Sequence, residues 1–552
     1  MVPSSVAGAV RWQNPWLAVH TGHIRKQFPS SPRQGASTAS AVHVTECTAL
    51  RRAREMHAQR VTATARCHQL YLSGASRHHR WQRQPCRHAR VAHSIVGALS
   101  GTDTAADVVV VGAGVAGLTC ARTLRARGLD VLLVEAADDV GGRVRTDVVE
   151  GFLLDRGFHI YLTSYPEALR QLDAAALDLR PFYAGALVRV SGGWHRVADP
   201  VRHLGDALAS LLPDNLVGDW VDKLRVGILR VLSLLTAPYE FLTAPEKTTL
   251  ARLQELGFSD AMVQRFWRPF LGGIFFDNEL QVTDRLLTFV MRSLATGENC
   301  LPSRGIGSVA KQLAASLDDS RILLNTRVVG GTFTRSPQEA AATLNVEHGT
   351  SAGGTITARR AVVLAVEGPE AARLLAASGV QVPPASPAQP GVGTVCVYFA
   401  APVAPGDNQP ILYLNGDGPG RLVNNACVPS AVSPTYAPAG KALISASLVG
   451  VPLPGSATDP RTATGEAALV KAVSSELGDW FGVDKVSTWR HLRTYIVPFA
   501  QPGQSPPTQL ERPVRLSAGL YVCGDHVEAA TLDGAMRSGR RAAEAVLQDI
   551  NA

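Results

Sequence analysis

Three glycines and one glutamate stand at the spacing of a dinucleotide-binding turn. Gly112, Gly114 and Gly117 follow a run of valines at 108–111 in GxGxxG order, and Glu135 comes 23 positions after the first glycine. In such a turn the first glycine permits the bend, the second lets the backbone approach a pyrophosphate, and the third lets a helix pack closely on a strand. A carboxylate at Glu135 can accept from ribose hydroxyls and would repel a 2′-phosphate, which argues against NADP. The spacing therefore predicts a bound dinucleotide.

The elements around these residues have the order that the turn requires. The valine run suits a strand buried on both faces of a parallel sheet. Residues 115–127 form the expected helix, and its first N–H groups, from Val115 and Ala116 onward, can meet phosphates without a lysine. A second strand is expected at 130–134, followed by Glu135 and Ala136. The sequence thus predicts an α/β fold with a Rossmann-type domain.

Two further motifs favour FAD over NAD. Gly141, Gly142 and Arg143 provide a second close backbone approach and a guanidinium that can pair with a pyrophosphate or with a group near the flavin. Near the other end, 519–525 is expected to form a short buried strand that ends at Asp525, which can accept from ribitol hydroxyls. An exposed Asp525 without a ligand is the alternative. The helix expected at 532–547 opens with small residues that let its N–H groups reach a flavin.

Together these residues resemble the flavin-containing amine oxidase superfamily, and most closely its carotenoid and phytoene desaturase and isomerase-like branch. The resemblance covers nearly everything from Asp107 onward. The stretch 154–159 looks like the family's segment beside the isoalloxazine, and 322–329 and 361–375 look like later strands of its FAD domain. The resemblance implies these FAD-binding residues: Gly112, Gly114, Val115, Ala116, Gly117, Glu135, Ala136, Gly142, Arg143, Gly157, Phe158, Val328, Gly524, Asp525, Gly534 and Ala535.

The order of the motifs predicts two interleaved domains after a leader. The FAD-binding domain is expected to comprise 104–165, 300–378 and 515–552, and a mixed α+β substrate domain to comprise 166–299 and 379–514. The substrate domain should hold these elements: strands at 393–399, 411–414 and 442–448, a helix at 466–481, and a segment at 489–502 that lines the cavity or packs in the core. A second GxGxxA motif, at Gly305, Gly307 and Ala310, is not interpreted as a nucleotide site because it follows Pro302 rather than a strand.

Residues 1–103 differ in composition from the rest of the chain. The first hundred residues hold 14 Lys and Arg, only two acidic residues and nine of the 15 histidines. Composition rich in arginine and poor in acids is typical of an organellar transit peptide, so we expect import into a plastid, with the mitochondrion as the alternative. A nucleic-acid-binding arm is the competing reading, but aromatic residues are sparse, and no nucleic-acid partner is expected.

The cysteines and apolar segments indicate neither a metal nor a spanning helix. The eight cysteines form no CxxC pair and have no metal-ligand spacing, so no metal site is expected. No cysteine lies between Cys427 and Cys523, and the FAD is therefore expected to be noncovalent. Residues 220–241 form an apolar helical pattern interrupted by Lys223, Arg225 and Arg230. This helix either lies in the core of the substrate domain or rests peripherally on a membrane with its basic residues at the headgroups.

Departures from the amine oxidase pattern bear on the substrate. The strand 391–399 looks like the one that carries a lysine near the flavin N5 in amine oxidases, yet it holds no lysine. The motif at 524–526 reads GDH, closer to the desaturases' GD than to the amine oxidases' GTE. His159 and His526 each adjoin a predicted FAD contact and could shuttle a proton, although structural roles are the alternative. Catalytic residues are otherwise not identifiable.

Four functions stay open. The preferred one is a desaturase-like dehydrogenase that passes a hydride from an apolar isoprenoid or polyene-type substrate to flavin N5 and hands the electrons to a quinone or to oxygen. A redox-neutral carotenoid isomerase would turn over without consuming an acceptor. An amine or protoporphyrinogen oxidase-like enzyme is the third reading. The fourth is a flavin-binding protein without catalysis.

Overall fold

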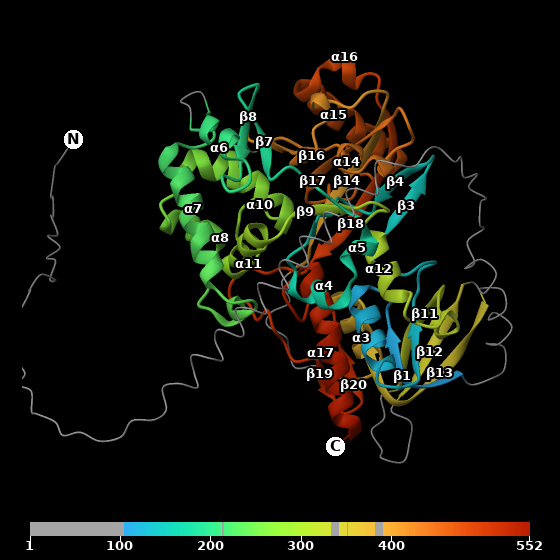
Figure 1. Ribbon diagram of the computed structural model, residues 1–552. Coiled ribbons are helices and arrows are strands. Elements are labelled where there is room, and N and C mark those ends of the chain that lie inside the picture. Colours follow the sequence, from blue (N-terminus) through green and yellow to red (C-terminus); the bar gives the residue numbers. More distant parts are fainter. Residues whose placement is uncertain are drawn as a thin grey trace, which may run out of the picture. The chain divides into compact units, whose positions relative to one another are not determined.

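The first sheet of the molecule is built from three separated stretches of chain. The computed structural model describes residues 104–211, 215–332, 342–349, 351–380, 390–418 and 420–551, so the predicted leader at 1–103 lies outside the described residues. Within them this sheet has the strand order β10-β2-β1-β13-β12-β11, with β20 paired to β13 and β19 to β20 (Figure 1). The bounds are β1 Thr104–Val111, β2 Val131–Val134, β10 Ile322–Leu323, β11 Thr326–Thr332, β12 Ala342–His348, β13 Ser351–Leu364, β19 Arg515–Ser517 and β20 Leu520–Val522.

The centre of this sheet is parallel. β1 runs parallel to β2 and β13, and β13 runs parallel to β20. Val108, Val109 and Val110 are 0% exposed, as expected for a strand with both faces covered. The carboxyl ends of β1, β2, β13 and β20 therefore meet at one edge, where ligands bind in open α/β sheets. This arrangement confirms the predicted α/β fold.

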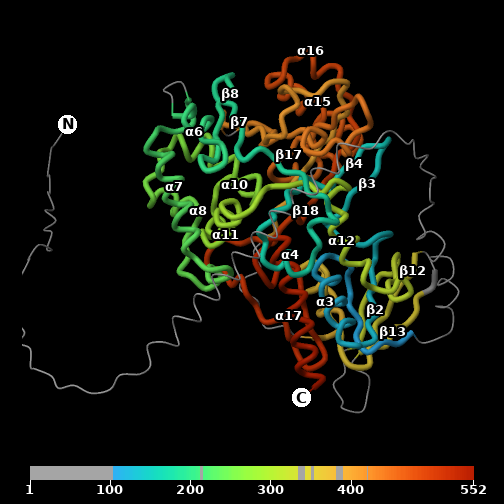
Figure 2. The backbone as a smooth tube through the Cα atoms, in the orientation of Figure 1, coloured from blue at the N-terminus to red at the C-terminus, as the bar shows by residue number. Residues whose placement is uncertain are grey.

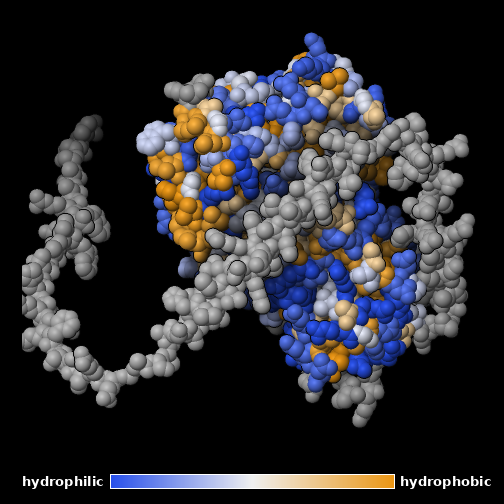
Figure 3. All heavy atoms as spheres, viewed as in Figure 1, coloured by the Kyte–Doolittle hydropathy of each residue, from blue (hydrophilic) through white to orange (hydrophobic). Residues whose placement is uncertain are grey.

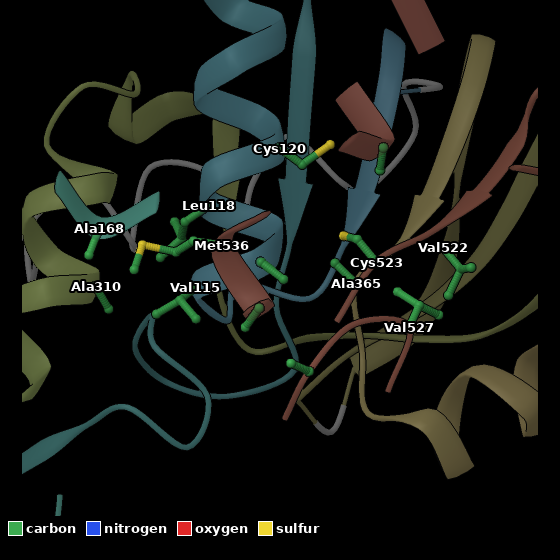
Figure 4. Close-up of a cluster of buried hydrophobic side chains, with 14 of the residues drawn as sticks. Val115, Leu118, Cys120, Ala168, Ala310, Ala365, Val522, Cys523, Val527 and Met536 are labelled. Carbon is green, nitrogen blue, oxygen red and sulfur yellow. The ribbon is translucent and has the colours of Figure 1, made fainter. Parts of the chain in front are cut away.

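Two helices from opposite ends of the chain pack together on this sheet. Figure 2 shows α17 (Leu532–Asn551, red) beside α3 (Val115–Arg125, blue), in agreement with their contacts. The close approach depends on Gly539, because a Cβ there would lie 2.1 Å from the carbonyl oxygen of Ala116. Figure 4 shows Val115 and Leu118 of α3 gathered with Met536 of α17 in the same apolar cluster. The first glycine motif and the C-terminal helix are thus parts of one core.

A second sheet has seven strands in the order β18-β14-β17-β16-β15-β7-β8. Along β14 (Val392–Ala401), Val395, Val397 and Phe399 pack with α15 (Ala463–Phe481), whereas Cys396 and Tyr398 point into a different core cluster. This period of two shows that both faces of the strand are buried. The other bounds are β7 Gly185–Val190, β8 Gly193–Ala198, β15 Leu412–Asn415, β16 Asn425–Cys427, β17 Ala442–Val449 and β18 Arg490–Gln501.

Helices and two small sheets complete the described part of the chain. The helix bounds are α4 Pro166–Gln171, α5 Ala174–Leu177, α6 Leu204–Ala209, α7 Trp220–Leu235, α8 Thr249–Glu255, α9 Asp260–Met262, α10 Arg268–Phe275, α11 Asp284–Thr296, α12 Gly307–Ala314, α13 Gly368–Ala377, α14 Pro429–Val432 and α16 Val483–Val486. The small sheets are β3 Thr146–Val149 with β4 Phe152–Asp155, and β5 Tyr161–Leu162 and β6 Leu179–Pro181 on either side of β9 Asn299–Pro302. None of the described helices is both long and apolar enough to cross a membrane.

Several predicted elements differ from the structure. The strand expected at 322–329 is divided into β10 and β11 at Asn325, whose φ of +53° turns the chain. The helix expected at 220–241 ends at Leu235, three residues before Pro238, because proline cannot continue a helix. The helix expected at 532–547 continues to Asn551. The second glycine motif does follow a strand, β9, which contradicts the argument from Pro302.

Candidate flavin site

The glycine turn has the geometry that its sequence predicts. Gly112 has a φ of +106°, and a Cβ on it would lie 2.6 Å from the carbonyl oxygen of Ala365. A Cβ on Gly117 would lie 2.0 Å from the carbonyl oxygen of Gly112, so the helix can pack on the strand only with glycine here. A Cβ on Gly114 would meet nothing within 4 Å. Gly114, Val115 and Ala116 line the cavity described below, and no side chain caps this helix end. The free N–H groups of α3 therefore face open space that an anion can fill.

Glu135 lies at the carboxyl end of β2 and is fixed by the backbone. Its Oε2 accepts from the N–H of Ala113 at 2.6 Å, and its Oε1 accepts from the N–H of Ala137 at 2.8 Å. The carboxylate therefore joins the glycine turn to the segment after β2 while it lines the cavity. Each oxygen keeps a lone pair that can accept from a ribose hydroxyl.

Arg143 joins the second glycine motif to the C-terminal one. Its Nη1 lies 2.8 Å from Oδ2 of Asp525 and its Nη2 donates to Oδ1 at 2.9 Å, so the pair is bidentate. Nη1 also donates to the carbonyl oxygen of Ala500 at 2.6 Å. The Nε atom lies 3.5 Å from Oε1 of Glu367. Burial opposes the charged form, but the Asp525 carboxylate outweighs it and raises the pKa of Arg143.

These segments enclose one continuous cavity of about 690 Å³. Its size is within the range of cofactor and ligand pockets. Thirteen of the predicted FAD contacts line it: Gly112, Gly114, Val115, Ala116, Glu135, Ala136, Gly142, Arg143, Gly157, Phe158, Gly524, Asp525 and Ala535. Three do not: Gly117 and Gly534 pack against backbone, and Val328 is buried in the core beside Arg327, which does line the cavity.

Charge is divided sharply between two parts of this cavity. Seven charged residues line it, namely Glu135, Arg143, Arg156, Arg327, Glu367, Glu370 and Asp525. All seven belong to the segments 104–165, 300–378 and 515–552. The nineteen lining residues contributed by 166–299 and 379–514 include no charged side chain and are mostly aromatic or aliphatic, among them Phe182, Phe270, Ile274, Val290 and Leu412. One part of the cavity thus suits an ionic cofactor and the other an apolar molecule.

The stretch 154–159 is anchored by a buried carboxylate. Asp155 accepts from Oγ1 of Thr146 at 2.6 Å, from the N–H of Ile306 at 3.0 Å and from Oη of Tyr436 at 2.9 Å. Burial raises the pKa of Asp155. His159 lines the cavity with its Nδ1 at 2.9 Å from the carbonyl oxygen of Gly157, and burial lowers the pKa of His159. The hydrogen bond to a carbonyl fixes Nδ1 as the protonated nitrogen, so the Nε2 of neutral His159 can accept a proton.

The other candidates from the sequence fall outside the cavity or serve packing. His526 does not line it, and both ring nitrogens are buried without a hydrogen-bond partner among the described residues. The second glycine motif packs on the Asp155 anchor, because Cβ atoms on Gly305 and Gly307 would clash with Thr146. In β14 the residue that lines the cavity is Thr394, whose hydroxyl donates to the carbonyl oxygen of Leu448 at 2.6 Å.

Sequence reasoning missed Glu367 and Glu370. Both follow β13, whose end pairs with the two cofactor strands, since the N–H of Ala365 bonds to Val111 and the N–H of Cys523 to Leu364. The available signal was the apolar run 361–366, which is followed directly by an acid, Glu367. Among the described residues, no group of three or more His, Cys, Asp or Glu could hold a metal ion.

The site fits a flavin dinucleotide. The uncapped start of α3 and the open space beside Gly114 can take phosphates, Glu135 can take a ribose, and Asp525 of the C-terminal motif lines the same cavity. A dinucleotide-binding sheet joined to a cavity with many apolar lining residues is the arrangement expected of a nucleotide-dependent oxidoreductase.

Comparison with known proteins identifies the family. A family model described as flavin containing amine oxidoreductase matches residues 115–547, and the chain belongs to this family. The family's description implies a bound flavin and an oxidoreductase reaction, and the match confirms the resemblance seen in the sequence.

Individual relatives match over shorter stretches. Coproporphyrinogen III oxidase of Propionibacterium freudenreichii subsp. freudenreichii is 28% identical over 194 residues, which cover 32% of this chain and 34% of that protein. Hydroxyneurosporene desaturase of Rubrivivax gelatinosus is 58% identical over 50 residues, 9% of this chain and 10% of that protein. The matched stretches thus span about a third or less of these relatives. Cyclohexylamine oxidase from Brevibacterium oxydans IH-35A shares the fold, with a TM-score of 0.58 at 17% identity over 81% of this chain and 100% of that chain.

Proposed function

We propose that the chain is a desaturase-like dehydrogenase that removes hydrogen from an apolar isoprenoid or polyene-type substrate. Bound FAD would supply the hydride acceptor. The observation that supports this substrate class is the absence of charge among the nineteen described lining residues of 166–299 and 379–514. A cationic amine entering that part of the cavity would lose its hydration without meeting a carboxylate, whereas a hydrocarbon would lose nothing.

The surroundings of β14 support the same choice. Thr394 is the lining residue of this strand, and its hydroxyl is already used by Leu448. The strand on which the sequence resemblance expects an amine oxidase lysine thus offers the cavity neither an amine nor a hydroxyl that is free to donate. Hydroxyneurosporene desaturase, among the relatives, acts by name on a polyene.

We further propose that the FAD is held noncovalently. The described cysteines, at 120, 300, 396, 427 and 523, are buried, and none of them lines the cavity. Burial raises the pKa of Cys300 to about 12, and a thiol that stays protonated is a poor nucleophile.

The apolar substrate would be taken from a lipid surface by the exposed face of α6 and α7. This face is defined by Leu204, Leu208, Leu211, Trp220, Leu224, Ile228, Val231 and Leu235, and it forms the large orange region over these helices in Figure 3. Exposed fractions of 66% for Trp220 and 77% for Leu235 are high for such side chains. A contiguous apolar surface of this kind marks an interaction site.

Beside the buried Leu229, the inner face of α7 also carries charged groups. Its inner face holds Asp222, which is 0% exposed, and Arg230, which bonds to Asp199 at 2.8 Å. Lys223 donates to backbone carbonyls of Ser210 and Gly218. Lys223 and Arg230 are therefore bonded within the protein and are not free to meet lipid headgroups. This corrects the sequence-based alternative in which the basic residues of the helix lie at the headgroups. The apolar face alone would enter the bilayer interface.

This face lies one helix away from the cavity. Arg230 of α7 donates to the carbonyl oxygen of Ala295 at 3.1 Å, and Arg292 donates to that of Leu234 at 2.9 Å, so α7 and α11 are joined. Val290 and Leu294 of α11 line the cavity. An apolar substrate would thus have a short path from a bilayer to the site.

Vesicle binding tests the lipid surface. We expect the full chain to sediment with zwitterionic phosphatidylcholine vesicles, and the double variant Leu224→Ser, Ile228→Ser to stay in the supernatant with an unchanged melting temperature. A control is Leu453→Ser, an exposed leucine outside α6 and α7 (76% exposed, against 58% for Leu224). Equal sedimentation of the double variant and the wild type would refute the assignment.

Anaerobic bleaching of the bound flavin tests the reaction. Protein with FAD is mixed with hydroxyneurosporene, protoporphyrinogen or putrescine while the absorbance of the oxidised flavin is recorded. We expect bleaching by the polyene, reoxidation by a quinone or by oxygen, and none with putrescine. Bleaching by putrescine with peroxide release would identify an amine oxidase instead. Isomerisation of a polyene by pre-reduced protein without acceptor consumption would identify an isomerase, and a flavin unresponsive to all three would contradict catalysis on any of them.

The leader composition supports import into a plastid, and secondarily into a mitochondrion. A fluorescent fusion carrying residues 1–103 should accumulate in one of these organelles, and diffuse fluorescence in the cytosol would contradict this proposal.

A further inference from the structure

Glu367 lines the cavity beside Arg143, but none of the flavin contacts expected at the site involves it. It follows β13, whose end is bonded on one side to β1 through Ala365 and Val111 and on the other to β20 through Leu364 and Cys523. A Cβ on Gly112 would lie 3.2 Å from Cγ1 of Val366, the residue before Glu367. Glu367 is therefore placed between the glycine turn and the segment of Asp525.

The charges around it do not balance. Arg143 is already neutralised by its bidentate contact with Asp525, and Glu367 is a second carboxylate, 3.5 Å from the same guanidinium. Glu370 lies one helical turn later and forms a bidentate pair with Arg373, whose Nε and Nη2 each donate to one carboxylate oxygen at 2.8 Å. Glu367 is thus the carboxylate of this trio that lacks a cation of its own, and burial together with Asp525 and Glu370 raises the pKa of Glu367.

We propose that Glu367 limits the affinity of the site for the cofactor's pyrophosphate, by repelling it and by competing with it for Arg143. This inference rests on the proposed flavin site and adds a residue that acts against binding. A pyrophosphate carries two negative charges and would enter beside Gly114 and Gly142, which line the cavity with Glu367 and Arg143. The side chain of Glu367 is 45% exposed, so water screens the repulsion without removing it.

Equilibrium binding to the flavin-free full chain tests this proposal. FAD and riboflavin, which lacks the pyrophosphate, are titrated into wild type, Glu367→Gln and Glu370→Gln at low and at high salt, and the quenching of flavin fluorescence is measured. We expect Glu367→Gln to lower the Kd for FAD by roughly three- to tenfold at low salt, as one removed unit charge at a partly screened site implies. The gain should shrink at high salt and be absent for riboflavin. Glu370→Gln should change the Kd by less than about twofold because its charge is already paired.

Each other result has a defined meaning. An unchanged or higher Kd of Glu367→Gln for FAD would overturn the proposal, the higher value by showing that Glu367 positions Arg143 for the cofactor. A gain that riboflavin shares, or one that salt does not reduce, would overturn it as well. Wild type that takes up no FAD at all would instead refute the flavin site itself. Glu367→Ala guards against an effect particular to the glutamine, since it should show the same gain.

Discussion

Two glycines three residues apart should respond to an added side chain in opposite ways. A Cβ on Gly114 meets nothing within 4 Å, whereas a Cβ on Gly117 lies 2.0 Å from the carbonyl oxygen of Gly112. The backbone of Gly114 has φ −68° and ψ 172°, which any residue can adopt. Side chains at Gly114 therefore enter the cavity, and side chains at Gly117 enter the fold.

The magnitudes follow from these distances. Gly117→Ala forces a carbon against backbone, and relief requires the helix and the strand to separate by about 1 Å, which overpacked cores resist at a cost of about 3 kcal/mol or more. Gly114→Val should leave stability within about 0.5 kcal/mol, as expected for a substitution into open space. The same side chain occupies the space where phosphates would lie, so we expect a Kd for FAD at least about tenfold higher, or about 1.4 kcal/mol.

Both variants are measured without and with FAD. Thermal melting of the flavin-free proteins should give wild-type values for Gly114→Val and a much lower temperature, or insoluble protein, for Gly117→Ala. FAD should raise the melting temperature of the wild type and do so much less for Gly114→Val. Full flavin content in Gly114→Val would refute the placement of the phosphates at α3. A stable Gly117→Ala would refute the packing argument.

Two further variants test the surroundings of the site. Asp222→Ala should cost about 2 to 4 kcal/mol of stability. The reason is that buried Asp222 accepts from the N–H of Ser259 at 2.8 Å and caps α7 together with Asp219. A melting temperature within about one or two degrees of wild type would contradict this role. Burial lowers the pKa of His526 in the fold, so the unfolded chain binds the proton first and stability falls as the pH drops below the unfolded value of about 6.5. His526→Gln should therefore lose less stability than wild type between about pH 7 and pH 5, and parallel curves would exclude this titration.

The cofactor segments could be predicted from the sequence because each is local. The turn at Gly112, the helix start at Val115 and the acid at the end of β2 all follow from short-range spacing, and the structure brings them together. The positions of Gly534 and Val328 outside the cavity lining were harder to predict. They depend on contacts with Ala529 and with the core rather than on neighbours in sequence. Glu367 was not recognised because its significance comes from the pairing of β13 with β1 and β20.

The orientation of α7 is a second feature that depends on contacts between residues distant in sequence. The pattern of 220–235 is amphipathic, and an amphipathic pattern gives no indication of which face meets the protein. The usual expectation places Leu224 and Ile228 in the core and the basic residues in solvent. In the structure Leu224 and Ile228 are exposed, and Asp199 and Asp222 hold Arg230 and the N–H of Ser259 on the inner side, where Leu229 is also buried. These polar contacts join residues distant in sequence, so the pattern of the helix alone does not reveal them.

Charge separation within one cavity connects these observations. A dinucleotide needs charged and polar partners, whereas the apolar substrate that we propose needs their absence, and the proposed hydride transfer requires both in one space. The chain takes the charged lining from the segments of the first sheet and a lining without charge from the segments between them, as this proposal requires. His159 is the lining residue whose ordinary pKa is nearest neutrality, and its Gly157 contact leaves Nε2 available. Charged substitutions such as Ile274→Asp should therefore leave the Kd for FAD unchanged and weaken turnover of the proposed apolar substrate even at saturating FAD, whereas substitutions of Arg143 should raise the Kd for FAD and lower turnover at subsaturating FAD.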